Sequence, residues 1–468
     1  MSKQNEAFRD TIGTVTKEGK RNWIFPKMPK GRFYNARTMV TNLYLLIFFT
    51  LPWIKVNGEP LFLFDIPNSK FIIFGQIFWP QDFFIFGIAM LTFLVFIVLF
   101  TVVFGRIFCG WVCPQTVFME MIFRKIEYWI EGSSEMQRKL AEMPWNKEKI
   151  TKRGLKFLAF YSLSFIIANY FLAYIIGMDR VLLYMKEGII QHIETFVPLL
   201  LFATTFFFVY WWFREQVCII VCPYGRLQGV MLDPDSIVVA YDHVRGEPRS
   251  RFKKKREEEK QDEVGDCVDC FECVKVCPTG IDIRNGTQLE CVNCTACIDA
   301  CDAVMEKFNR PLGLIKYASE NNISKGEKTK FTNRTKAYTV ILVGLLVVLV
   351  ALLFTRKDVQ TNVVRARGML YQEQPNNQIS NIYNVSLINK TRKEIPITLK
   401  VENEDLPGTI KIVGKGLVVK KEAAGSGVFF IYIDKDKLTK RQNKIEIGVY
   451  SNGKKIDEVK TSFLAPGG

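Results

Sequence analysis

Five apolar runs divide the 468-residue chain into polar and charged segments of unequal length. An α-helix needs about 20 apolar residues to cross the hydrocarbon core of a bilayer. The runs have close to this length and consist mainly of Leu, Ile, Val and Phe. They predict an α-helical membrane bundle of about five spans, over residues 38–54, 83–104, 156–176, 193–213 and 338–354.

Residues 358–468 follow a different pattern. Apolar and polar residues alternate over short stretches such as NIYNVSLIN, GVFFIYI and KIEIGVY, which Gly, Asn, Asp and Lys separate. Alternation with a period of two is typical of a strand with one buried face. Several such strands predict an all-β sandwich of the immunoglobulin type. This segment has no Cys and no His, so it offers no soft or imidazole metal ligand.

Basic residues are distributed unevenly between the predicted spans. The formal net charge is +16, and Lys and Arg are concentrated in residues 1–37, 105–153 and 214–337. Segments rich in Lys and Arg stay on the cytoplasmic side of a membrane. Five spans would then place residues 1–37 in the cytoplasm and residues 358–468 outside it. The distribution favours a lipid bilayer over nucleic acid as the partner of the basic residues.

Eight of the twelve cysteines lie in two runs with the spacing C-x-x-C-x-x-C-x-x-x-C. In bacterial ferredoxins three cysteines of such a run hold one [4Fe–4S] cluster, and the fourth holds the other cluster. The spacing therefore predicts an inserted bacterial-type di-cluster ferredoxin domain with crossed ligation. The first cluster would be held by Cys267, Cys270, Cys273 and Cys301, and the second by Cys291, Cys294, Cys297 and Cys277.

One proline of the ferredoxin pattern is missing. Pro278 follows the fourth cysteine of the first run, whereas Asp302 stands at the equivalent place in the second. This difference affects the shape of a loop and not the number of ligands. Zinc ribbons and disulfides are the alternatives, but zinc sites usually pair two cysteines with two distant ligands, and disulfide frameworks belong to small secreted domains. Reduced thiols also favour a cytoplasmic location for this domain.

The other four cysteines form two C-x-x-x-C-P motifs, RIFCGWVCPQT and REQVCIIVCPYGRLQG, each just after a predicted span. Positions i and i+4 share one face of a helix, so each pair can offer two thiolates to one ion. Thiolates select copper(I), zinc or iron–sulfur clusters. A copper or other thiol redox site, a third cluster and purely structural thiols remain open. The candidate catalytic and metal-binding residues are Cys109, Cys113, Cys218 and Cys222.

These patterns predict five segments along the chain. The run RSRFKKKREEEKQDE, residues 249–263, is read as a solvated linker that leads into the ferredoxin-like domain. No P-loop, no Ser-His-Asp set and no C-x-x-C-H haem motif occurs, so hydrolytic and nucleotide chemistry are unsupported. The predicted segments are a basic N-terminus (1–37), a four-span membrane domain (38–248), the linker and ferredoxin-like domain (249–337), a fifth transmembrane helix (338–357) and the β-sandwich (358–468).

Several motifs together resemble a known family. CGWVCPQT, VCPYGRLQG, YDHVRGEPR, CPTGIDIRNGTQLEC and ACIDACDAVMEK are similar to those of the cytochrome c oxidase accessory proteins called CcoG, FixG or RdxA. The resemblance covers nearly the whole chain. It implies a multi-pass protein of the bacterial inner membrane, with a cytoplasmic ferredoxin domain and a periplasmic immunoglobulin-like domain. It also implies an oxidoreductase that reduces copper(II) to copper(I) for a cbb-type oxidase, with oxidase subunits or copper chaperones and an unidentified electron donor as partners.

Two other functional classes remain open at this point. The first is an electron-transfer subunit that passes electrons from quinol to a periplasmic reductase. The large β-domain after the last span disfavours this class. The second is a non-enzymatic scaffold that holds copper or oxidase subunits during assembly, for which the clusters would not need to carry electrons.

Overall fold

The computed structural model describes residues 13–466, apart from 17, 57, 68–69, 80–81, 251–264, 327–331, 357–358 and the single positions 367, 369, 392, 404, 415, 422 and 439. The predicted linker over 249–263 falls almost entirely outside the described residues. Contacts divide the chain into two units. One unit comprises Met1–Gly75 with Phe86–Val347, and the other comprises Gln76–Ile85 with Val348–Gly468.

Four helical segments of the described chain are long and apolar enough to cross a membrane. The third of these segments, Ile189–Phe213, consists of three consecutive elements: η5 (Ile189–His192), α9 (Ile193–Phe208) and the π-helix η6 (Val209–Phe213). These segments confirm the membrane character predicted from the apolar runs. They are α2 (Phe83–Phe104), α7 (Lys147–Ile176), residues Ile189–Phe213 and α15 (Asn333–Phe354).

The predicted first span is also helical, as α1 (Arg32–Thr50), but it is not among these four segments. Its first half carries polar side chains, and it buries Arg37 and Thr41 against protein. Polar residues in the first half shorten the apolar part of the helix. The predicted count of five spans is therefore not confirmed.

Short elements connect the long helices. The stretch after α1, for which the sequence pattern predicted no strands, forms η2 (Leu51–Trp53), β1 (Lys55–Val56), β2 (Glu59–Pro60), β3 (Phe62–Asp65), β4 (Lys70–Ile73) and β5 (Gln76–Phe78). Strand β1 pairs with β2 and β3 pairs with β4, both antiparallel. The connection from α2 to α7 contains α3 (Ile107–Trp111), α4 (Pro114–Phe118), the π-helix η4 (Met119–Phe123), α5 (Arg124–Glu131) and α6 (Ser134–Glu142), and α8 (Met178–Glu187) follows α7.

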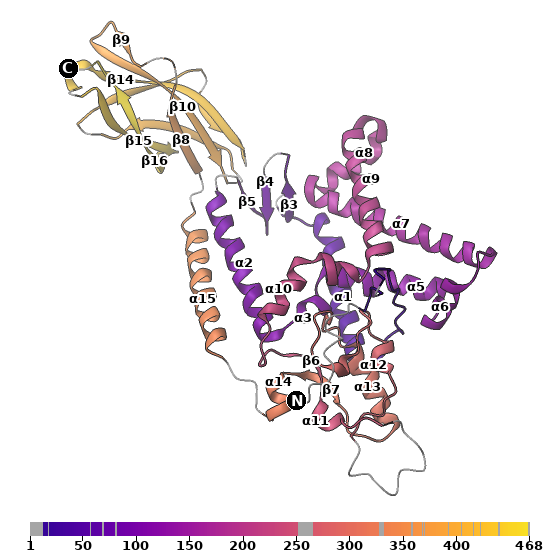
Figure 1. Ribbon diagram of the computed structural model, residues 1–468. Helices are drawn as coiled ribbons and strands as arrows, with labels where there is room; N and C mark the ends of the chain where they lie inside the picture. Colours follow the sequence, from indigo (N-terminus) through magenta and orange to yellow (C-terminus); the bar gives the residue numbers. More distant parts are fainter. Residues whose placement is uncertain are drawn as a thin grey trace. The chain divides into compact units, whose positions relative to one another are not determined.

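The cysteine-rich domain follows the third long segment (Figure 1). It is built on a two-stranded antiparallel sheet, in which Val238 is paired with Ala318 and Tyr241 with Ile315. The chain reaches this sheet through a second set of short helices near the span end. The elements are the π-helix η7 (Val217–Val221), α10 (Pro223–Met231), β6 (Val238–Tyr241), α11 (His243–Gly246), α12 (Glu272–Lys275), η10 (Ile283–Asn285), α13 (Ala296–Lys307), β7 (Ile315–Ala318) and α14 (Glu320–Lys325).

The two cysteine runs have the same local backbone conformation. In the first run Asp269 and Phe271 have φ of 49° and 60°, and at the equivalent places of the second run Asn293 and Thr295 have φ of 53° and 65°. Such left-handed residues reverse the chain within a few positions. Each run therefore curls tightly and continues into a helix, α12 or α13.

The C-terminal unit contains an antiparallel β-sandwich, as the alternating pattern predicted. One sheet has the strand order β12-β14-β10-β8, with β9 also paired to β10, and the other has the order β13-β11-β15-β16. Buried side chains such as Tyr383, Phe429, Ile447 and Phe463 fill the core between the sheets. The strands are β8 (Val359–Arg365), β9 (Gln372–Gln374), β10 (Gln378–Asn389), β11 (Ile395–Val401), β12 (Gly408–Ile412), β13 (Leu417–Val419), β14 (Ala424–Asp434), β15 (Gln442–Ser451) and β16 (Lys454–Leu464), with η11 (Lys435–Lys437) before β15.

Candidate functional site

Two cavities inside the cysteine-rich domain are lined by cysteines. The first has about 330 Å³ of empty volume, part of which is open to solvent, and apolar side chains such as Met305 and Leu314 complete its wall. The second has about 340 Å³ of empty volume, also partly open, and shares Cys273 with the first. Its wall also includes Cys277 from the first run. The cysteines around the first cavity are Cys267, Cys270, Cys273 and Cys301, and those around the second are Cys277, Cys291, Cys294 and Cys297, in addition to Cys273.

Electrostatic contacts between the thiols follow the same grouping. Burial raises the pKa of Cys301 most, followed by Cys273, Cys267 and Cys270, all of which belong to the other run. In the same way Cys277 acts on Cys291 and Cys294. The tight backbone turn in each run places its fourth cysteine at the other cavity. Each cavity is thus lined by three cysteines of one run and the last cysteine of the other, and Cys273 lines both cavities.

The chemistry of these residues fits four-thiolate coordination of an iron–sulfur cluster. Burial raises the pKa of Cys273 and Cys291 to about 12 and that of Cys294 to about 11, so these thiols bind a metal only by losing a proton. In the described part of the chain, no three His, Cys, Asp or Glu side chains are grouped closely enough for a single metal ion. Thiols that are distributed around a cavity fit an iron–sulfur cluster, in which each thiolate binds a different iron.

The C-x-x-x-C-P cysteines lie at breaks between short helices. Cys109 lies in α3 and Cys113 is the N-cap of α4, while Cys218 lies in η7 and Cys222 is the N-cap of α10. The expectation that each pair shares one helix face is wrong, because the second cysteine of each pair precedes a proline. The residue before proline avoids the α conformation, and ψ is 126° at Cys113 and 110° at Cys222.

The four thiols are nevertheless close enough to act on one another electrostatically. Burial, followed by the proximity of Cys113, raises the pKa of Cys109 to about 11. Burial also raises the pKa of Cys218 to about 12, with contributions from the other three thiols. Two short segments that are about a hundred residues apart in sequence therefore converge at one place near the span ends.

This group of thiols lies directly against the second cysteine run. Cys109 and Cys218 pack on a buried cluster formed by Val276, Val292, Cys294 and Ala296. A hydrogen bond of 3.0 Å from Trp111 Nε1 to the Tyr317 hydroxyl supports the same junction. Cys109 and Cys218 are therefore neighbours of the second cavity, which Val292 and Cys294 also line.

Gly110 allows this close approach. A Cβ atom at this position would lie 2.6 Å from the Val292 carbonyl oxygen and 2.7 Å from that of Asn293, both of which are backbone atoms. We expect Gly110→Ala to separate the Cys109 loop from the second run, because neither backbone can move without distorting a cysteine loop. The measurement is the rate of Cys109 alkylation in the metal-free protein, which should rise several-fold.

Gly87→Ala is the matched control for this substitution. Gly87 lies in α2, and a Cβ atom there would meet nothing within 4 Å. Its alkylation rate should equal that of the wild type. Equal rates for Gly110→Ala and the wild type would contradict the proposed steric role of Gly110.

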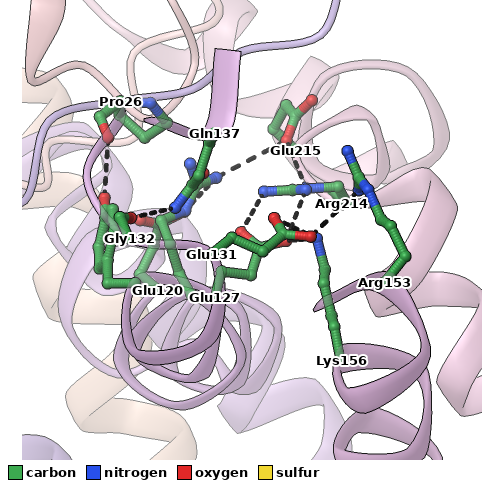
Figure 2. Close-up of polar contacts among 12 residues, drawn as sticks. Pro26, Glu120, Glu127, Glu131, Gly132, Gln137, Arg153, Lys156, Arg214 and Glu215 are labelled. Carbon is green, nitrogen blue, oxygen red and sulfur yellow. Dashed lines mark hydrogen bonds and ion pairs between the residues drawn. The ribbon is translucent and has the colours of Figure 1, made fainter. Parts of the chain in front are cut away.

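A buried network of charges lies next to the thiols and was not predicted (Figure 2). Arg214 donates to both carboxylate oxygens of Glu127 at 2.9 and 2.8 Å, and Lys156 lies 2.6 Å from the same carboxylate. Burial disfavours the ionised form of Glu127, but Arg214 and Lys156 outweigh it and hold its pKa at about 2. The sequence signal was the spacing of Glu120, Arg124, Glu127 and Glu131, which places them on one helix face.

The network continues to the segment that carries Cys218. Glu215 lies 3.0 Å from Arg21 and 3.6 Å from the Nε of Arg214. A cavity of about 310 Å³ is lined by Glu215, Cys218 and Glu120, and it shares Thr279 and Val292 with the second cysteine cavity. The charged residues are therefore neighbours of Cys218.

Apolar helices joined to a ferredoxin-type domain and a β-sandwich define a class of membrane-associated iron–sulfur proteins. A model of the 4Fe–4S dicluster domain matches residues 213–320, and a model of a 4Fe–4S binding domain matches residues 86–133. Residues 349–466 match the IG-like fold at the C-terminus of FixG. These matches confirm the predicted 4Fe–4S chemistry and the immunoglobulin-like domain.

The chain belongs to the FixG/RdxA family of 4Fe–4S membrane proteins. It is 35% identical to protein RdxB of Cereibacter sphaeroides over 82% of this chain and 83% of that protein. It is 33% identical to protein RdxA of the same organism, over 88% and 89% of the two chains. The nitrogen fixation protein FixG of Rhizobium meliloti is 38% identical over 64% of this chain and 58% of that protein. The predicted family resemblance is thereby confirmed.

Proposed function

We propose that this protein reduces copper(II) to copper(I) at the span-end thiols and supplies the product for assembly of a cbb-type cytochrome oxidase. The observation that carries the proposal is the packing of Cys109 and Cys218 against the core around Cys294. Electrons held in the cysteine-rich domain therefore have a short path to thiols that can meet a metal substrate. Each copper(II) ion takes one electron, and the copper(I) formed is the state that thiolates prefer.

The clusters would be held by the two groups of four cysteines, one around each cavity, and would supply one-electron transfer. The residues around them exclude water and fix the thiols. For the substrate, Glu120 and Glu215 line the cavity beside Cys218. Both carboxylates are paired with arginines, Glu120 with Arg124 and Glu215 with Arg21, so the thiolates are the groups that would bind copper and retain the monovalent product. The basic segments support placing the cysteine-rich domain on the cytoplasmic side of a bacterial inner membrane.

The test is copper(II) reduction by anaerobically purified protein whose clusters have first been reduced. We expect Cys109→Ser, Cys113→Ser, Cys218→Ser and Cys222→Ser each to slow the formation of copper(I) by at least tenfold. Iron content should remain at about eight atoms per chain, because the substituted thiols are not cluster ligands in this proposal. Unchanged reduction in all four variants would exclude the thiols as the site of copper reduction.

A third [4Fe–4S] cluster is a specific alternative for the same four thiols. The match of residues 86–133 to a 4Fe–4S binding domain favours it, and that stretch holds only the cysteines Cys109 and Cys113. A cluster with four thiolate ligands would also need Cys218 and Cys222. Iron quantitation separates the two proposals, because a third cluster raises the content to about twelve atoms. The four serine variants would then lose about four atoms each.

A further inference from the structure

Two buried arginines bridge the span-end loops and the second cysteine run. Arg37 donates from Nε to the Gly110 carbonyl and from Nη1 to the Cys294 carbonyl, both at 3.0 Å. Arg106 donates to the carbonyls of Leu289 and Gly225. Each arginine thus joins one C-x-x-x-C-P loop to the loop that carries Cys291 and Cys294. Both residues are only 4% exposed.

These two arginines have no carboxylate partner among the described residues. Their hydrogen-bond partners there are carbonyl oxygens, and neither guanidinium forms a salt bridge. The first cavity is different, because Arg284 lies there and is paired with Asp282 at 2.7 Å and Asp269 at 2.6 Å. Two arginines without a carboxylate partner among the described residues thus contact the loop that lines the second cavity, whereas the arginine at the first cavity is paired with two carboxylates.

We infer that Arg37 and Arg106 are positioning residues that make the second cysteine run the exit for electrons. They hold this run against Cys109 and Cys218, and they raise the reduction potential of the cluster bound there above that of the other cluster. This inference rests on the proposed electron transfer from the cysteine-rich domain to the span-end thiols. It adds a direction for electron transfer, from the first cluster, near Cys270, to the second cluster, near Cys294.

The physical reason is that reduction adds a negative charge. A buried positive charge nearby stabilises the reduced form, and the low dielectric of the interior strengthens that effect. Exposure of Cys270 at the other end leaves the first cluster accessible to an electron donor.

The test is an anaerobic redox titration of the full-length protein, followed by electron paramagnetic resonance. We expect two waves, and Cys270→Ser identifies the wave of the first cluster because it changes a ligand of that cluster. In the wild type the second cluster should have the higher potential. Arg37→Gln should lower the potential of the second cluster alone, whereas Arg37→Lys, which keeps the charge, should restore it towards the wild-type value.

Arg32→Gln is the matched control, since Arg32 lies on the same helix but its side chain is 70% exposed. It should leave the wave of the second cluster unchanged. If Arg37→Gln loses iron, its potential cannot be interpreted. The inference then requires that Arg37→Lys and Arg106→Lys, which keep the positive charge, keep the potential of the second cluster above that of the first. A higher potential for the first cluster, or an equal shift in the Lys and Gln variants, overturns the inference. The titration contains no copper, so its failure is distinct from failure of the proposed reductase activity.

Discussion

Cys301→Ser is expected to damage the cluster of the first cysteine run, although Cys301 belongs by sequence to the second run. It lines the cavity with Cys267, Cys270 and Cys273. After burial, these three thiols contribute most to the raised pKa of Cys301. Conversely, Cys277→Ser should damage the cluster of the second run. Each variant that loses a cluster completely should fall from about eight to about four iron atoms per chain.

Spectra distinguish crossed ligation from ligation within each run. The paramagnetic resonance spectrum of Cys301→Ser should match that of Cys270→Ser, and the spectrum of Cys277→Ser should match that of Cys294→Ser. If each run held its own cluster, Cys301→Ser would instead match Cys294→Ser. The four variants change one thiol each to a hydroxyl of similar shape, so they serve as controls for one another.

Glu127→Ala should be among the most destabilising substitutions outside the cysteines. Glu127 is 1% exposed and accepts from Arg214 and Lys156, so its removal leaves two buried cations without their main partner. Breaking a buried ion pair in this way costs about 3–5 kcal/mol. The measurement is the free energy of unfolding in mixed detergent micelles. Glu148→Ala is the control, because Glu148 forms an exposed pair with Lys152 that is worth at most about 0.5 kcal/mol.

The contribution of Glu127 should also depend on pH. Its pKa in the folded protein is about 2, which lies below the value of about 4.3 for a free glutamate. Stability from this group is therefore fully present above about pH 5, and it is lost as the pH falls towards 2. The wild type should lose more stability than Glu127→Gln between these limits. Parallel pH profiles for the two proteins would contradict an ionised Glu127 in the network.

Sequence patterns predicted the features of this protein that depend on interactions within a short stretch of chain. Apolar runs of sufficient length form helices because the bilayer interior offers no hydrogen-bond partner for the backbone, so the backbone groups must bond to one another. The observed helices α2 and α15 lie close to two of the predicted spans. Alternation in 358–468 predicted the β-sandwich, because one face of each strand must be buried. The cysteine spacing predicted the dicluster domain, because it reflects the geometry of the bound group itself.

Features that depend on distant segments were predicted poorly. The first apolar run begins inside α1, whose polar half buries Arg37, and no local pattern shows that this arginine reaches the Gly110 and Cys294 carbonyls. Glu127 lies in residues 105–153, for which the sequence indicated only a high content of basic residues. Its members come from α5, α7 and the segment after η6, so their burial depends on packing.

The sequence by itself determined the apolar helices, the strand-rich C-terminus and the eight cysteines suited to two clusters, because each is specified by spacing within a short stretch. Only the tertiary structure decided which cluster site faces the span-end thiols. That choice depends on Arg37 and Arg106, which each join loops from separate parts of the chain. It also depends on Gly110, where the absence of a side chain lets two backbones meet. Such contacts form between segments far apart in sequence, and so no local pattern encodes them.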